Sequence, residues 1–335
     1  MRILVLGGTE FVGRAYVEEA LGAGHDVTLF NRGQTAPELF PGIAKLRGDR
    51  DIDLSVLGGG EWDAVFDPSC YLPRHARMAA DILGDVVAHY TLVSSLSVYA
   101  DETTPDQDES GPLATMEDPT IEDPDAFYGP LKALSEREIE RGFGDRALIV
   151  RPGFICGPYD NADRMPYWLR RLGRGGEVLA PDSPEFPVQL IDARDIARFA
   201  LTMAERSQGG VFNLCAPPDG HRMEYLLETA AHVVGATDFT LTWAPGKFLV
   251  EQGLGRWEAL PWWVAPRYAA ITRFDASKAH SAGLVVRPIA ESFRDCWAWD
   301  LTRGDAPLPP DVGLAPEREA ELLATLRARG QTTNA

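Results

Sequence analysis

Tyr128 and Lys132, in the stretch FYGPLKALSE, are the residues whose types and spacing most directly suggest chemistry. In a helix, a separation of four residues places both side chains on one face. A tyrosine with an ordinary pKa near ~10 is a poor base at neutral pH, but a neighbouring ammonium lowers that pKa and makes the phenolate accessible. Such a phenol can take or give the proton of a hydroxyl group. By itself the pair is a weak motif, because most chance occurrences are surface pairs.

A helix that starts near Tyr128 is expected to present this pair. Pro130 is compatible with such a start, since proline is tolerated in the first helical turn. Earlier in the chain, TLVSSLSVYA follows a predicted strand. A serine at the carboxyl end of a strand can hydrogen-bond a substrate oxygen. The alternative is ordinary turn chemistry, because serine is common wherever strands end.

The N-terminal stretch RILVLGGTEFVGRA matches most of a dinucleotide-binding turn. Such a turn needs glycines for a tight bend, for close approach of the backbone to phosphate and for helix–strand packing, and Gly7 and Gly13 fill the outer two roles. Glu10 stands where the middle glycine is expected. A carboxylate beside a pyrophosphate is unfavourable unless it turns to solvent or pairs with a cation such as Arg14 or Arg32. The turn is therefore predicted to bind a dinucleotide, with Glu10 as the group that could weaken it.

The second predicted strand ends in VTLFNRG, without the carboxylate that accepts a hydrogen bond from an adenosine 2′-hydroxyl. Asn31 and Arg32 stand at its tip instead, and a guanidinium is suited to a 2′-phosphate. NADP is therefore favoured over NAD, the alternative being an ordinary exposed arginine. Further on, LRGDRD places Asp49 and Arg50 after another predicted strand, where a carboxylate could accept from the adenine amino group.

Short apolar runs alternate with helical patterns through the first half of the chain. This alternation predicts an α/β fold with a Rossmann-like, doubly wound parallel sheet. An unrelated α/β domain would share the pattern, so alternation alone does not fix the function. Strands are expected at Ile3–Leu6, Asp26–Phe30, Ala64–Phe66, Tyr90–Ser94 and Ala147–Val150, and helices at Gly13–Gly22, Arg74–Leu83 and Leu131–Arg141.

The composition of the chain changes after Arg151, because proline and glycine become frequent there. Six of the eight tryptophans lie at or beyond Trp243. We expect residues 1–155 to form an NAD(P)-binding Rossmann domain. Residues 156–306 would form mainly a smaller substrate-binding lobe, interleaved with the first domain. Residues 307–335 would form a linker, a short helix over Pro316–Arg329 and a disordered tail after Gly330.

Composition excludes several classes of partner. The 335 residues carry a net charge of −18, which disfavours nucleic acid and anionic membrane surfaces. Ten acidic residues and no lysine or arginine fall between Asp101 and Asp125, a run that is expected to be a solvated loop. Four widely spaced cysteines, no paired histidines, no signal-like segment and no long apolar stretch indicate a cytoplasmic protein without a metal site, a membrane span or disulfides.

Six motifs in order, GGTEFVG, NRG, GD, SSLSVYA, YGPLK and RPGFICGP, resemble the extended short-chain dehydrogenase/reductases, which include the NAD(P)-dependent epimerase/dehydratase group. The resemblance extends through PVQLIDARDIARF and GVFNLCAP to about residue 300. It implies that Tyr128 is the catalytic acid/base and that Lys132 lowers its pKa and holds the nicotinamide ribose. Ser95 would orient the substrate. The further residues that it places at the cofactor are Gly7, Thr9, Phe11, Val12, Asp49 and the backbone of Pro152, Gly153, Phe154 and Ile155.

The sequence also departs from the family pattern. Leu96 and Ser97 follow Ser95, where sugar-nucleotide 4,6-dehydratases of the family have an Asp-Glu pair, so elimination of water by that route is not expected. FDPSCYLP is an unusual sequence after the strand at Ala64–Phe66. The side chains that are expected at the substrate are Asp67, Ser69, Tyr71, Ser97, Tyr159, Arg164 and Trp168.

These residues predict an NADP-preferring oxidoreductase that moves hydride between the nicotinamide and a secondary alcohol or ketone carbon of a small molecule. Two alternatives remain open. An epimerase would use the same residues and retain its cofactor, and a non-catalytic NADP-binding sensor would bind the cofactor without turnover. The resemblance favours a homodimer.

Overall fold

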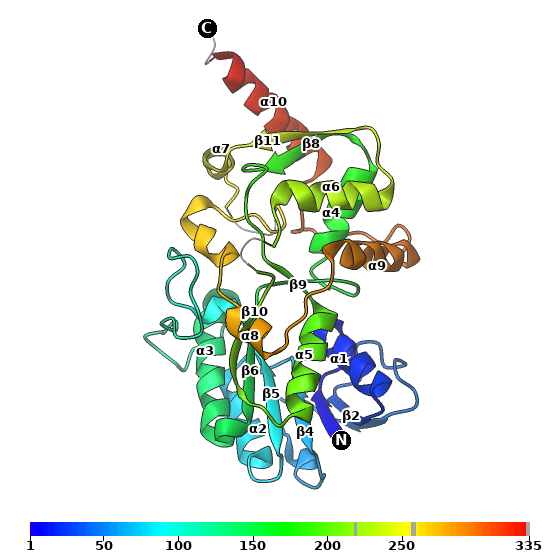
Figure 1. Ribbon diagram of the computed structural model, residues 1–335, viewed down its shortest axis with the longest axis vertical. Coiled ribbons are helices and arrows are strands. Elements are labelled where there is room, and N and C mark those ends of the chain that lie inside the picture. Colours follow the sequence, from blue (N-terminus) through cyan, green and yellow to red (C-terminus); the bar gives the residue numbers. More distant parts are fainter. Residues whose placement is uncertain (218–219, 256–258, 333–335) are drawn as a thin grey trace. The chain divides into compact units, whose positions relative to one another are not determined.

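The computed structural model describes residues 1–217, 220–255 and 259–332 (Figure 1). They form two compact units. The first unit consists of Met1–Gly153, Ile191–Cys215 and Phe274–Val286. The second consists of Phe154–Leu190, Ala216–Arg273 and the chain from Arg287 onward.

A seven-stranded sheet forms the centre of the first unit. Its strand order is β10-β6-β5-β4-β1-β2-β3, and every neighbouring pair is parallel. The order runs outward in both directions from β1 and β4, which is the doubly wound, Rossmann-like arrangement that the sequence predicts. The strands are β1 (Arg2–Leu6), β2 (Asp26–Asn31), β3 (Ala44–Arg47), β4 (Ala64–Asp67), β5 (His89–Val93), β6 (Ala147–Pro152) and β10 (Gly210–Leu214).

Helices cover both faces of this sheet. Helix α1 (Phe11–Gly22) packs with α5 (Ala193–Glu205), and α2 (Pro73–Leu83) packs with α3 (Pro124–Phe143) (Figure 1). The central strands are continuous apolar runs because neither face is left to solvent. Residues Ile3 to Leu6 of β1, for example, are at most 2% exposed. All five strands that the sequence predicts are present.

Helix α3 begins earlier than expected. It starts at Pro124, where the Asp123 side chain accepts hydrogen bonds from the N–H groups of Asp125 and Ala126. Phe127 has non-helical angles (φ −130°, ψ 35°). The kink follows from Pro130, whose ring interferes with the backbone one turn before it. The regular helix therefore resumes at Tyr128, which is the start that the sequence suggested for the whole element.

The second unit has its own apolar core. Helices α4 (Arg164–Gly173), α6 (Met223–Val234) and α9 (Ile289–Thr302) pack together, and β8 (Gly176–Pro181) pairs in parallel with β11 (Phe239–Ala244). The remaining elements are β7 (Phe154–Cys156), α7 (Gly246–Glu251), the 3-10 helix η4 (Pro266–Thr272) and α10 (Pro316–Thr332). Helix α10 continues past Arg329 to Thr332, so residues 331 and 332 are helical and not the disordered tail that we expected. The rest of that tail, residues 333–335, lies outside the described residues.

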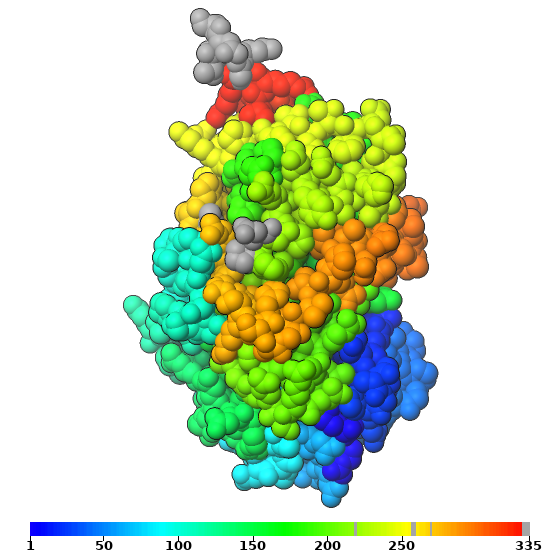
Figure 2. Space-filling view, in the orientation of Figure 1, coloured from blue at the N-terminus to red at the C-terminus, as the bar shows by residue number. Residues whose placement is uncertain are grey.

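The acidic run between residues 101 and 125 is only partly a solvated loop. Figure 2 shows this segment, cyan to blue-green, at the surface of the molecule. Its middle is nevertheless attached to the first unit: Glu109 accepts a hydrogen bond from the backbone N–H of Asn213, and Gln107 bridges to Phe274. Its charged side chains remain largely exposed, while its backbone forms part of the edge beside β10.

Candidate active site

The candidate catalytic groups lie at the carboxyl edge of the sheet. Ser95 follows β5 and caps the short 3-10 helix η2 (Leu96–Val98), while Tyr128 and Lys132 come from α3. The carboxyl edge of an open parallel sheet is where such folds bind ligands. Two sets of contacts show how α3 is held against this edge.

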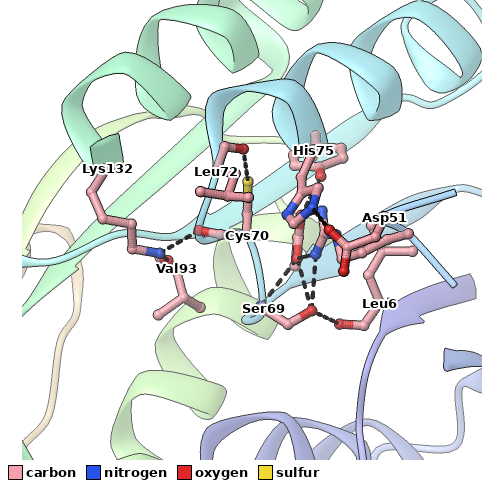
Figure 3. A network of polar contacts seen from close by, with 11 residues as sticks. Leu6, Asp51, Ser69, Cys70, Leu72, His75, Val93 and Lys132 are labelled. Carbon is pink, nitrogen blue, oxygen red and sulfur yellow. Dashed lines mark hydrogen bonds and ion pairs between the residues drawn. The ribbon is translucent and has the colours of Figure 1, made fainter. Parts of the chain in front are cut away.

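The first set fixes the Lys132 side chain. Its ammonium is almost fully buried and donates hydrogen bonds to the carbonyl oxygens of Cys70 (2.8 Å) and Val93 (2.7 Å) (Figure 3). These carbonyls lie just past the end of β4 and at the end of β5. An ammonium has three N–H donors, and these two bonds account for two of them. The position of Lys132 is therefore set by two neighbouring strands rather than by its own helix.

The second set brings the start of α3 against η2. Tyr128 is 37% exposed, and the next residue, Gly129, is buried. A Cβ atom added at Gly129 would lie 2.1 Å from the carbonyl oxygen of Ser97, so only glycine allows α3 to approach η2 this closely. The Ser95 hydroxyl accepts from the N–H of Ser97 (3.1 Å) and donates to the Ser97 hydroxyl (3.1 Å). Tyr128, Lys132 and Ser95 therefore lie on segments that contact one another.

Asp67 and Ser69, expected at the substrate, are part of a buried network. The Asp67 carboxylate accepts two hydrogen bonds from the Arg50 guanidinium (2.8 and 2.9 Å) and one from the Tyr90 hydroxyl (2.8 Å). Burial raises the pKa of Asp67, but Arg50 more than offsets this and holds it below its usual range. Burial lowers the pKa of Arg50, but the negative charge of Asp67 has a larger effect than burial and raises the pKa of Arg50 above its ordinary value. The side chains of Asp67 and Arg50 are hydrogen-bonded to each other. Asp67 is therefore not placed to bind substrate directly, nor Arg50 to bind adenine.

Tyr71 is the exposed member of the same segment. It is 48% exposed between buried Cys70 and Leu72, and the Lys132 ammonium lies 5.4 Å from the centre of its ring. Partial burial raises the pKa of Tyr71, and the positive charge of Lys132 acts in the opposite direction. A second phenol therefore stands close to the candidate catalytic lysine, and its contact with a substrate stays a prediction.

The glycine turn between β1 and α1 has the backbone that a dinucleotide site requires. Gly7 and Gly8 have positive φ angles (118° and 91°), and a Cβ at Gly8 would lie 2.6 Å from the Leu29 side chain. Phe11, which begins α1, also has a positive φ (33°), an unusual conformation of the kind that concentrates at functional sites. The first N–H groups of a helix lack intrahelical acceptors and so can receive phosphate oxygens.

The other residues of this turn suit the same role. Gly13 packs against Gly8 at a distance that leaves little room for a side chain. Glu10 is the N-cap of α1, makes no capping hydrogen bond and is exposed, so its carboxylate can remain in solvent. Thr9 lies in the turn, and Val12 is buried on the helix. The geometry therefore fits a pyrophosphate in spite of Glu10.

The tip of β2 carries more positive charge than its own sequence reveals. Arg32 is exposed there, and Asn31 donates to the carbonyl of Gly7 (2.9 Å) while accepting a hydrogen bond from Arg47. Arg47 ends β3 and lies opposite Asn31 in the parallel register. The sequence of β2 does not indicate that Arg47 lies at this edge. That position follows only from the pairing of β2 with β3. Two guanidinium groups thus lie at this edge, where a 2′-phosphate would need them.

The remaining predicted cofactor residues are distributed as follows. Asp49 is partly exposed and accepts from the N–H of Asp51 within a turn. Pro152 ends β6, and the N–H of Gly153 donates to the carbonyl of Leu214 (3.0 Å). Phe154 and Ile155 begin the second unit in β7 and are partly exposed. Their contact with a cofactor stays a prediction.

Three further predicted substrate residues belong to the second unit. Tyr159 has a positive φ (68°) and its ring contacts Trp299, and Arg164 begins α4. Trp168 is fully buried in the core of this unit, and its indole N–H donates to the carbonyl of Pro261 (3.1 Å). Its burial gives Trp168 a packing role instead of the expected contact with substrate.

The sequence analysis did not predict the buried ion pair between Glu136 of α3 and Arg151 of β6. Glu136 lies one turn beyond Lys132 and accepts two hydrogen bonds from Arg151 of β6 (3.0 and 2.7 Å) and one from the Ser94 hydroxyl. Arg151 also donates to the Tyr99 hydroxyl (3.0 Å). The signal was available, because Tyr128, Lys132 and Glu136 repeat at intervals of four residues on one helical face. The pair fixes α3 to β6.

Among the residues that the structure describes, no group of histidine, cysteine and acidic side chains could hold a metal ion. Nor does any helix in that part of the chain have the length and apolar character needed to cross a membrane.

Comparison with known proteins bears on this geometry. Residues 67–215 match the sequence profile of the NAD dependent epimerase/dehydratase family. This segment of the chain is therefore similar to that family. The matched segment contains the 67–72 turn, the serines, the Tyr128–Lys132 pair and β6. The profile describes NAD-dependent enzymes, and the glycine turn precedes the matched segment in the chain.

Individual relatives are distant. The chain is 27% identical over 233 residues to the chloroplast stem-loop binding protein of 41 kDa b from Arabidopsis thaliana, a match that covers 64% of this chain and 58% of that protein. It is 25% identical over 266 residues to 2′-dehydrokanamycin reductase from Streptomyces kanamyceticus, covering 75% of this chain and 72% of the relative. The solved structure of the enzyme WbmH from Bordetella bronchiseptica in complex with NAD+ superposes with a TM-score of 0.67 at 14% identity, covering 90% and 99% of the two chains. At that identity the likeness shows a shared fold.

Proposed function

We propose that this protein is an NADP-preferring reductase, which moves hydride between the nicotinamide and a secondary alcohol or ketone carbon of a small molecule. The observation that carries the proposal is the placement of the Lys132 ammonium by the carbonyls of Cys70 and Val93, with Tyr128 and Ser95 on adjoining segments. The bound cofactor would supply the hydride, and the chain's own residues would handle the proton and the oxygen.

Proton transfer is assigned to Tyr128. In the reductive direction its phenol donates a proton to the substrate oxygen as the alcohol forms, which leaves a phenolate. The ammonium of Lys132, on the same face of α3, favours that phenolate through its positive charge. Ser95 holds the substrate oxygen by a hydrogen bond. In the oxidative direction the same three groups catalyse the reverse reaction.

The preference for NADP rests on two arginines. Arg32 and Arg47 lie at the tips of β2 and β3, and no acidic residue ends β2. Guanidinium groups bind phosphate by charge-assisted hydrogen bonds, so this edge suits a 2′-phosphate better than a ribose hydroxyl. The first N–H groups of α1, from Phe11 to Gly13, would hold the pyrophosphate.

Reduction is favoured over epimerisation by the choice of cofactor. An epimerase that uses these residues retains its cofactor through both half-reactions, whereas a dissociable NADP suits net reduction. The relative from Streptomyces kanamyceticus is named as a reductase, which supports the same direction. We further propose that the protein is a cytoplasmic homodimer. Its net charge of −18 supports a small-molecule substrate and disfavours nucleic acid and membrane surfaces as partners.

Calorimetric titration of cofactor-stripped protein with NADPH and with NADH is the first test. We expect tighter binding of NADPH, followed by stoichiometric loss of NADPH absorbance with one member of a ketone panel that includes keto-sugars and β-keto acids. Conversion of a substrate without net loss of NADPH would identify an epimerase. Binding without any turnover would support a sensor, and no binding of either cofactor would refute the proposal.

A pair of variants then tests the role of Tyr128. Tyr128→Phe should lower kcat by at least about 100-fold, the usual contribution of a positioned acid/base group. Tyr71→Phe is the matched control, because it removes the other phenolic hydroxyl near Lys132 and keeps the ring. If Tyr71 contacts the substrate but takes no part in proton transfer, this variant should change KM and leave kcat within about threefold of the wild type. The reverse pattern would transfer the acid/base role to Tyr71.

A further inference from the structure

The turn that follows β4 contacts two parts of the site that are far apart in sequence. Ser69 donates its hydroxyl hydrogen to the carbonyl of Leu6 (2.8 Å), the residue directly before Gly7. Its neighbour Cys70 supplies one of the two carbonyl acceptors of Lys132. Figure 3 shows this segment between Leu6 on one side and Lys132 on the other. The glycine turn and the catalytic lysine are thus joined through two consecutive residues.

The buried pair of Arg50 and Asp67 holds this turn in place. Asp67 accepts from the N–H of Ser69 (3.1 Å), and Arg50 donates to the Ser69 hydroxyl (2.9 Å) as well as to both carboxylate oxygens of Asp67. Asp67 is fully buried and the Arg50 side chain is 13% exposed, so water competes little for these bonds. Tyr90 of β5 also donates a hydrogen bond to Asp67 (2.8 Å).

We propose that Arg50 and Asp67 are a positioning pair, which holds the 68–71 turn so that Cys70 fixes Lys132 and Ser69 fixes the strand end before Gly7. The consequence for catalysis rests on the proposed function, whereas the effect on Lys132 does not. The pair touches neither substrate nor cofactor in this assignment. It acts through the backbone of the turn, and it couples the place where a pyrophosphate would bind to the place where the proton is transferred.

An alternative account is that the pair serves stability alone. Removing one partner of a buried ion pair strongly destabilises a protein, because the other charge is left buried and unpaired. Replacing both partners with apolar residues of similar volume is often tolerated. The double variant Arg50→Met/Asp67→Leu therefore keeps a filled interior while it removes every polar contact that the pair makes to Ser69. A purely structural role predicts no change at Lys132 in this variant.

The sequence offers a direct measurement of Lys132, because the chain has only four lysines: Lys45, Lys132, Lys247 and Lys278. Each can be followed separately by mass spectrometry of peptides after timed labelling with acetic anhydride. Lys132 is buried and hydrogen-bonded, so in the wild type it should react far more slowly than exposed Lys247 and Lys278. Exposed Lys247 and Lys278 calibrate the dose of reagent, and urea unfolding of each variant measures its global stability.

In the double variant the labelling rate of Lys132 should rise by about tenfold, since loss of its fixed acceptor increases local opening, while the other lysines keep their rates. The matched control is Arg171→Met/Glu319→Leu, which removes a similarly buried ion pair of the second unit. It should leave the Lys132 rate unchanged. If the double variant fails to fold, Tyr90→Phe removes one hydrogen bond from Asp67 and should raise the Lys132 rate by about threefold.

Activity supplies a second readout. A displaced Lys132 should shift the pH profile of kcat, and a displaced Leu6 carbonyl should weaken NADPH binding in calorimetry, whereas a loss of stability alone moves neither. An unchanged Lys132 labelling rate in the folded double variant overturns the positioning role. Absence of NADPH binding by the wild type would instead refute the proposed function, and the labelling experiment would still decide the role of the pair.

Discussion

Gly129 provides the sharpest test of how the site is assembled. Gly129→Ala adds a single methyl group, and its Cβ atom would lie 2.1 Å from the backbone carbonyl oxygen of Ser97. Carbon and oxygen atoms in such contacts are normally at least 3.0 Å apart. Neither atom belongs to a flexible side chain. The start of α3 must therefore move away from η2.

The size of the effect follows from that distance. A shift of about 1 Å in a positioned catalytic group can cost as much as 100-fold in rate, and Tyr128 directly precedes the added methyl group. We therefore expect kcat to fall by about 10- to 100-fold. Overpacking of this kind costs about 1–3 kcal/mol of stability, against which the better helix propensity of alanine offsets at most about 1 kcal/mol.

Steady-state kinetics with NADPH, calorimetry of cofactor binding and urea unfolding would measure these quantities. The Kd for NADPH should stay within about twofold, because Gly129 does not contact the glycine turn. Gly142→Ala is the matched control: it lies in the same helix, and its Cβ would lie 2.4 Å from the Cβ atom of Ala80 in α2. It should cost similar stability and spare kcat. Wild-type kcat in Gly129→Ala, or an equal loss in both variants, would refute the reasoning.

Three further predictions concern the cofactor edge and the pH dependence of stability. Arg47→Ala should weaken NADPH binding by about tenfold through loss of a charge-assisted hydrogen bond, and leave NADH binding unchanged by calorimetry. Glu10→Gln should tighten NADPH binding by no more than about threefold at low salt, and the gain should vanish at high salt, because the exposed carboxylate is screened. Burial lowers the pKa of His89 from 6.5 to about 4, so its contribution to stability is complete above pH 6.5 and is lost as the pH falls toward 4. Between about pH 7.5 and 5.5 the free energy of unfolding of the wild type should therefore fall by about 1.3 kcal/mol more than that of His89→Gln in urea titrations.

Each of these predictions has a clear contrary outcome. Equal losses of NADPH and NADH affinity in Arg47→Ala would place Arg47 in a structural role beside Asn31. A gain in Glu10→Gln that persists at high salt would mean that the carboxylate faces the pyrophosphate. Parallel pH curves for the wild type and His89→Gln would show that His89 titrates alike in the folded and unfolded chains.

Much of the candidate site could be predicted from the sequence because it depends on local pattern. The strand-to-helix turn at Gly7 requires glycine backbone angles, and Tyr128 and Lys132 share a face through the helical period. The parallel sheet follows from alternating apolar runs and helices. These signals lie within a few residues of each other, so no knowledge of distant contacts is needed to interpret them.

The tertiary structure alone decided which groups hold these residues. Lys132 takes its acceptors from Cys70 and Val93, which are 62 and 39 residues away in the chain. Arg50 pairs with Asp67 across the sheet, so two residues that the sequence assigned to cofactor and substrate are engaged with each other. Such partners depend on strand order and register, which bring together side chains whose spacing in the sequence carries no period. Local conformation is encoded along the chain, whereas the polar contacts that position a catalytic group form only when separate strands meet at one edge of the sheet.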